Sequence, residues 1–241
     1  SSAASDVYKR QPGEPNGGFS SPIKATALCR HTGEPAVTVA LRPPRPTTAN
    51  LLPALFARSW LKEQRLSDDG FCDSLATIQL SPSLSMALVF PGKQTFRRLS
   101  HRGLAAMDIS ARRAWNHASH NLQRAALDSQ GLRFWTRPAA CELPSAARFG
   151  GLQVRSHGAP ISSWIAHPET FTVLDKHMRR LLRSHSLTYL VPDSATLFAF
   201  AHLPDPYARQ LAADAVARVP RHRTVLHPRP LVWSNGFPRE L

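Results

Sequence analysis

Apolar and polar positions alternate most clearly over 84–90, where Leu84, Met86, Leu88 and Phe90 fall at every second position. Successive side chains of a strand point to opposite faces, so this spacing predicts a strand. The segment 75–80 has a similar character, and Pro82 lies in the short stretch between the two. We therefore expect a β-hairpin here.

A second hairpin is predicted over 187–201. Two apolar runs, 187–191 and 196–201, flank the turn-forming residues Pro192, Asp193 and Ser194. Further strands are predicted over 36–41, 132–136, 151–156, 224–226 and 231–233.

Apolar residues three and four positions apart predict helices between these strands. The first is predicted over 49–65, with a buried stripe formed by Leu52, Leu55, Phe56 and Trp60. The second covers 111–127 after the capping residue Ser110, and two more cover 161–166 and 169–183, on either side of Pro168. The last runs to Val219, with Asp205 as its cap and Pro206 as its first residue.

This order of elements repeats as β-α-β-β-α-β, which is typical of a ferredoxin-like unit. An antiparallel sheet of four strands needs one face covered, and two amphipathic helices can cover it. We expect an α+β fold of tandem ferredoxin-like (β-α-β-β-α-β) units, with antiparallel sheets covered by helices. The units are expected over 36–137 and 148–235, after a disordered lead or truncated element over 12–35. A single mixed α+β domain with the same element order is the alternative.

The first eleven residues, SSAASDVYKRQ, match the translation of a common transposase-based sequencing adapter. We expect residues 1–11 to be an adapter-derived artefact on a chain translated from environmental DNA. A natural flexible tail is the alternative. On the first interpretation the natural chain begins at or before Pro12, so no signal peptide can be sought at this end.

The composition is consistent with an anionic partner and also with the coding bias of GC-rich DNA. The formal net charge is +14, with 25 arginines against 5 lysines, and the chain has 21 prolines. Such a balance favours nucleic acid or another polyanion. GC-rich coding DNA produces the same mixture of arginine and proline without selection for binding. No apolar run approaches the roughly 20 residues of a spanning helix, so we expect no membrane span.

The cysteines favour a reducing compartment. Cys29, Cys72 and Cys141 lie far apart and show no CxxC spacing. This pattern argues against a disulfide scaffold or a zinc cluster. We expect small buried cysteines in a cytoplasmic protein.

Two groups of basic residues are candidates for an anion-binding site. On the helix 169–183, the predicted buried face consists of Phe171, Leu174, Met178, Leu181 and Leu182, and the opposite face carries Lys176, Arg179, Arg180 and Arg183. The second group surrounds the last loop and consists of Arg218, Arg221, His222, Arg223, His227 and Arg229. Arg97, Arg98, His101 and Arg102 could join it in space. The alternative for the helix is a solvated face whose arginines complement the C-terminal end of the helix dipole.

Patterns that indicate catalysis are missing. The sequence has no GxSxG elbow, no GxxxxGK[ST] loop and no GxGxxG turn, so we expect no cofactor and assign no catalytic residue. His117 and His120 lie three positions apart on a predicted helix, a spacing that can present two metal ligands. No third ligand motif accompanies them, and we expect no metal site.

Three segments carry a resemblance to a known family. They are ASHNL at 118–122, the strand and helical stretch through Ser162, Ser163, Trp164 and Ile165, and YLVPDSATLFAF at 189–200. With these segments the C-terminal half, back to about Ser110, resembles the YtpQ-like family of uncharacterised bacterial proteins. The chain departs from that family in its arginine-rich helices and in the HPE step at 167–169. The resemblance implies a cytosolic α+β protein of bacterial origin and carries over no catalytic residue.

Two functions remain open at this point. The first is a non-enzymatic module that binds a protein partner or regulates one. The second is a module that binds nucleic acid or another polyanion through its arginine-rich surfaces. The sequence offers no positive support for an enzyme.

Overall fold

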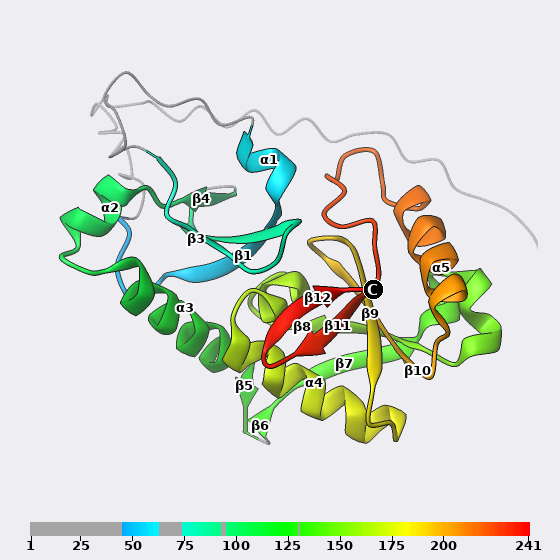
Figure 1. Ribbon diagram of the computed structural model, residues 1–241. Coiled ribbons are helices and arrows are strands. Elements are labelled where there is room, and N and C mark those ends of the chain that lie inside the picture. The colour runs from blue at the N-terminus through cyan, green and yellow to red at the C-terminus, as the bar shows by residue number, and fades with distance from the viewer. Residues whose placement is uncertain (1–44, 63–73, 93–94, 130) are drawn as a thin grey trace, which may run out of the picture. The chain divides into compact units, whose positions relative to one another are not determined.

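The computed structural model describes residues 45–62, 74–92, 95–129 and 131–241 (Figure 1). By its contacts the chain divides into Ser1–Leu41 and Arg42–Leu241, and every described residue belongs to the second unit. The fold of this unit is α+β with antiparallel sheets. The segments expected at 1–11, 12–35 and 36–41 lie outside the described residues.

The smaller sheet is built around β3 (Leu84–Pro91). β1 (Leu52–Ala57) pairs with one edge of β3, while β2 (Thr77–Gln79) and β4 (Phe96–Arg98) follow one another along the other edge. The predicted hairpin of 75–80 and 84–90 is thus confirmed. Every residue of β3 before Pro91 is buried.

The helix predicted over 49–65 is wrong for most of its length. Residues 52–57 form strand β1, and only a short helix α1 (Arg58–Lys62) follows among the described residues. Leu52, Leu55 and Phe56 have helical spacing, but six successive residues of this segment pair with β3. Pairing with a buried strand outweighs the local pattern. Pro53 fits because β1 pairs with no second described strand, and an edge strand tolerates a missing N–H.

The next two helices begin at serine caps. Ser100 Oγ accepts a hydrogen bond from Gly103 N at the start of α2 (His101–Ala106), and Ser110 Oγ accepts one from Arg113 N at the start of α3 (Ala111–Ala125). The prediction of a helix capped by Ser110 is confirmed. Ala114, Ala118 and Leu122 of α3 are fully buried in the core it shares with β1 and β3.

The larger sheet has six strands in the order β12-β11-β9-β10-β8-β7, all antiparallel to their neighbours. Their bounds are Phe134–Pro138 for β7, Leu152–Ser156 for β8, Leu187–Asp193 for β9, Thr196–Ala201 for β10, Leu231–Ser234 for β11 and Phe237–Glu240 for β12. The hairpin of β9 and β10 is as predicted. The segment 224–226 forms no strand, and Leu226 N instead donates to the carbonyl of Pro192.

Short elements connect these strands. β5 (Leu127–Asp128) and β6 (Gly131–Leu132) form a small hairpin before β7. Three 3₁₀ helices follow, η2 (Ala139–Cys141), η3 (Pro144–Phe149) and η4 (Ile161–Ile165). Cys141 is exposed rather than buried as expected, because it ends the short η2 turn at the surface.

The two long helices of the second half pack on opposite faces of the larger sheet. Along β9, Tyr189 and Val191 belong to the core of α4 (Pro168–Leu182), whereas Leu190 belongs to the core of α5 (Asp205–Ala217). Along β10, Leu197 and Ala199 face α4, while the α5 core takes the alternate phenylalanines, Phe198 and Phe200. We call the two sides the α4 face and the α5 face.

The structure does not confirm tandem ferredoxin-like units. β8 and β9 do run parallel on either side of β10, but β11 pairs with β9, and β7 takes the outer edge of β8. The expectation of one covered face fails for the same sheet, because every residue of β9 is buried. A continuous apolar run such as LFAFA in β10 is typical of a strand covered on both sides.

Helix bounds in this half agree closely with the predictions. Pro168 starts α4, and Phe171, Leu174 and Met178 are fully buried as expected, while Leu181 is 49% exposed. The cap of α5 differs from the prediction: Pro204 occupies the cap position, and Asp205 lies in the first turn.

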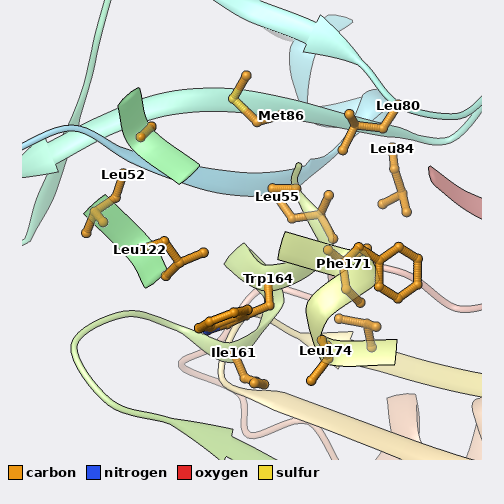
Figure 2. Packing of buried hydrophobic residues seen from close by; sticks show 14 of the residues in the cluster. Leu52, Leu55, Leu80, Leu84, Met86, Leu122, Ile161, Trp164, Phe171 and Leu174 are labelled. Atoms are coloured by element: carbon orange, nitrogen blue, oxygen red, sulfur yellow. The ribbon is translucent and has the colours of Figure 1, made fainter. Parts of the chain in front are cut away.

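One core joins the two sheets. It contains Leu55 from β1, Met86 from β3, Trp164 from η4 and Phe171 from α4, and Figure 2 shows these side chains gathered in a single cluster. Trp164 is fully buried. The small sheet and the α4 face are therefore held together by shared apolar burial. None of the helices in the described ranges has the length and apolar character needed to cross a bilayer.

Candidate anion-binding site

The basic face of α4 is partly used by the fold itself. Arg179 Nε lies 2.6 Å from Oδ2 of Asp175, one turn earlier, and its guanidinium stacks 5.3 Å from the ring centroid of Trp233 in β11. The Asp175 side chain is only 4% exposed. Because a buried carboxylate needs a compensating charge, the Arg179 charge is used to neutralise Asp175, although the Arg179 side chain is still 33% exposed.

Asp175 is also held by β9. Its Oδ1 accepts a hydrogen bond of 2.9 Å from the hydroxyl of Tyr189. Burial raises the pKa of Asp175 above its usual value, although the hydrogen bond from Tyr189 and the Arg179 charge oppose that rise. The remaining basic residues of this group, Lys176, Arg180 and Arg183, are exposed.

Two residues of the second basic group, Arg218 and Arg223, border a cavity of about 330 Å³ at the end of α5. Arg155 reaches it from β8, Arg218 from the C-cap of α5, and Arg223 from the following loop. The two basic groups of the sequence therefore do not converge, because one lies on the helix of the α4 face and the other at the end of the α5 face.

Two carboxylates line this first cavity, and both have partners. Glu142 pairs with Arg137 at 2.5 Å. Asp193 is buried, accepts hydrogen bonds from Ala195 N and Thr196 Oγ1, and lies 3.4 Å from Arg223 Nη1. Asp193 thus stabilises the β9–β10 turn and neutralises only part of the positive charge around the first cavity.

A second cavity, also of about 330 Å³, adjoins the first through Arg223. Its walls are the loop 222–226 on one side and β1, α1 and β4 on the other. Phe56 and Trp60 stack here with ring centroids 4.6 Å apart, and Arg98 Cζ lies 4.2 Å from the Trp60 centroid. The second cavity therefore combines aromatic surface with two arginines.

A third cavity, of about 430 Å³, adjoins the second through Ala57 and Leu226. Arg58 and Arg229 line it, and Arg229 Nη1 lies 3.0 Å from Oε2 of Glu240 in β12. Arg58 Nη1 donates to the carbonyl of Pro82 at 3.4 Å.

Ser83, His227 and Glu240 meet in the third cavity. Ser83 Oγ donates to Glu240 Oε1 and lies 3.4 Å from His227 Nδ1. Burial lowers the pKa of His227. Burial alone would raise the pKa of Glu240, but the hydrogen bond from Ser83 and the charges of His227 and Arg229 hold the pKa of Glu240 below its usual value. Because Ser83 directly precedes β3 and Glu240 belongs to β12, these contacts join the start of β3 to the edge strand β12.

We call the six arginines that line these three cavities the arginine row: Arg58, Arg98, Arg155, Arg218, Arg223 and Arg229. Among the described residues, the carboxylates lining the same cavities are Glu142, Asp193 and Glu240. Arg58, Arg98, Arg155 and Arg218 form no ion pair with any carboxylate in the described part of the chain. The row therefore keeps an excess of positive charge in a concave surface.

Sequence reasoning found part of this row. Arg218, Arg223 and Arg229 were predicted as one group, and Arg98, from the group expected to join them, lines the same cavity as Arg223. Arg221 is exposed and lines none of the three cavities. Arg58 and Arg155 were missed, since each is a lone arginine in the sequence. Arg58 follows β1, which pairs with β3, and Arg155 lies on β8, which pairs with β10, and only these pairings bring the two residues to the site.

Histidines and acidic side chains meet at the start of α4. His120 Nε2 lies 4.0 Å from Oε2 of Glu169, and His167 binds Glu169 N and Asn116 instead. No group of three or more histidine, cysteine or acidic side chains suited to a metal ion occurs within the described ranges.

Comparison with known proteins adds no relative: no family model, no curated protein and no solved structure matches the chain. The YtpQ-like resemblance therefore stays a prediction. The geometry of the arginine row carries the functional argument.

Proposed function

We propose that this protein binds a polyanion along the arginine row. The observation that carries the proposal is the set of four arginines without an acidic partner among the described residues, placed along three adjoining cavities. Arginine guanidinium groups donate bidentate hydrogen bonds to phosphate groups. Clustered positive charge in a concave surface also attracts anions from a distance.

The test uses inorganic polyphosphate, whose only recognisable feature is its row of phosphates. Binding is measured by titration calorimetry at several salt concentrations. We expect the affinity to fall steeply with added salt, because each neutralised phosphate releases counterions. No binding at low salt would refute the proposal.

A pair of matched variants locates the binding. Arg155→Glu with Arg218→Glu changes two exposed residues of the row, and Arg112→Glu with Arg113→Glu makes the same change in charge on the first turn of α3. We expect the first pair to weaken binding at least about tenfold and to flatten the salt dependence. The second pair should act weakly, through net charge alone, and an equal loss in both would show that binding does not use the row.

A second candidate function is binding of a protein partner at the outer edge of β7. This strand pairs with β8 on one side and with no described strand on the other, and Trp135 on it is 43% exposed. An open edge strand is a template for pairing with another chain. If β7 of one copy pairs with that of another, sedimentation velocity will show concentration-dependent dimers that Trp135→Ser abolishes; a monomer at all concentrations would contradict this pairing.

A further inference from the structure

The middle of the arginine row differs from its ends. The first and third cavities offer arginines and carboxylates, whereas the second offers Phe56 and Trp60 together with Arg98 and Arg223. A polyanion recognised by charge alone gains nothing from an indole ring. Aromatic rings and arginines interleaved along one path are typical of surfaces that bind single-stranded nucleic acid.

The indole of Trp60 is not enclosed by its two neighbours. Arg98 Cζ lies 4.2 Å from its centroid and the Phe56 centroid lies 4.6 Å from it, yet Arg98 Cζ is 5.6 Å from the Phe56 centroid. If Phe56 and Arg98 lay on opposite sides of the indole, they would be much farther apart than either is from it. Trp60 is half-buried, so part of its surface stays open to the cavity.

The size of the second cavity fits one nucleobase rather than a duplex. A volume of about 330 Å³ is that of a small-ligand site. Bases in a duplex are stacked inside the helix, whereas the bases of a single strand can turn outward and stack on an aromatic or guanidinium plane. The arginines that line the two adjoining cavities would then bind the flanking phosphates.

From these observations we infer that the polyanion is single-stranded nucleic acid, with a base stacked against Trp60 in the second cavity and the backbone following the arginine row. This inference rests on the proposed function and adds the class of ligand. It predicts a contribution to binding that depends on bases and is independent of phosphate charge.

The experiment compares three probes on the full chain: a single-stranded oligothymidine, the same sequence as a duplex, and inorganic polyphosphate. Affinities are measured for the native protein, Trp60→Ala and Trp60→Phe, and each variant is first checked by thermal unfolding. We expect Trp60→Ala to weaken oligothymidine binding about tenfold and to leave polyphosphate binding unchanged. Trp60→Phe, which keeps a flat ring, should lose about threefold or less.

The outcomes separate the two proposals. If no probe binds at low salt, the proposed function fails. If polyphosphate and oligothymidine both bind but neither is affected by Trp60→Ala, the row binds polyanions through charge alone, and only the inference of a stacked base fails. Tighter binding of the duplex than of the single strand would also overturn the inference. If Trp60→Ala does not fold, the quenching of tryptophan fluorescence by oligothymidine is compared between the native protein and Trp60→Phe. Stacking on Trp60 requires stronger quenching of the native protein, and equal quenching of the two refutes stacking.

Discussion

The arginines on the two faces of the larger sheet differ in whether they pair with a buried carboxylate. On the α4 face, Arg179 neutralises the buried Asp175 and stacks on Trp233, so its charge serves the fold. At the end of the α5 face, Arg155 and Arg218 border a cavity and form no ion pair with a carboxylate in the described part of the chain. The density of arginines in a sequence therefore says little about how many of them are available to a ligand. What decides is whether a buried carboxylate lies within reach.

The largest effect is expected from Arg179→Glu. The variant places a second carboxylate beside the buried Asp175, and we expect a loss of about 3 kcal/mol in the free energy of unfolding. Arg180→Glu on the exposed side of the same turn is the control and should cost less than about 1 kcal/mol. Urea unfolding measures both, and equal small losses would show that Arg179 is as free as the arginines of the row.

The separation of the two faces is tested by Leu174→Val in α4 and Leu211→Val in α5. Each removes one methylene from a different buried core, at a cost of about 1 kcal/mol. Because the sheet lies between them, the double variant should lose the sum of the two, within about 0.5 kcal/mol. A larger coupling energy would mean that the helices share one core.

A change in the opposite direction is expected for Asp193→Asn. The amide can still accept the hydrogen bond from Ala195 N, but Arg223 loses its charged partner and becomes free for the ligand. We expect polyphosphate binding to tighten roughly fivefold, or about 1 kcal/mol. Unchanged or weaker affinity in a variant of near-native stability would show that Arg223 does not contact the anion.

The smallest effect concerns the start of α4. Burial lowers the pKa of His167 from 6.5 to about 4, with the Glu169 charge opposing the shift, so the folded protein holds this histidine neutral. Stability from this group is therefore complete above pH 6.5 and is lost as the pH falls toward 4, because the unfolded chain binds the proton more readily. His167→Asn keeps a side-chain cap for Glu169 N and cannot titrate. The variant should lack this part of the acid dependence in thermal unfolding; identical pH profiles would remove His167 from the account.

Much of the secondary structure could be predicted from local signals. Ser110 and the alternation over 84–90 mark their elements correctly, because caps and one-residue alternation are properties of neighbouring residues. Pro168, predicted as the break before the helix 169–183, is the first residue of α4. The hairpin of β11 and β12 was missed although Asn235 and Gly236, both with positive φ, form its two-residue turn. Asn-Gly between strands is the strongest short-range hairpin signal, so this strand was within reach of the sequence.

The rest depended on contacts between distant segments. Leu52, Leu55 and Phe56 fit a helix or a strand, and only pairing with β3 decides between them. The side of the sheet on which α5 packs is equally non-local. For the candidate site, the sequence grouped Arg218 with Arg223, but it could not show that Arg155 from β8 borders the same cavity or that Arg179 is bound to Asp175.

The most direct test of the account is one comparison of two variants of equal charge. Arg155→Glu with Arg218→Glu changes the arginine row, and Lys176→Glu with Arg180→Glu changes exposed residues of α4. The account predicts that the first pair flattens the salt dependence of oligothymidine binding and weakens binding at least about tenfold, while the second changes affinity less than about threefold. A loss of oligothymidine affinity confined to the α4 pair would contradict the account and would place the binding site on α4.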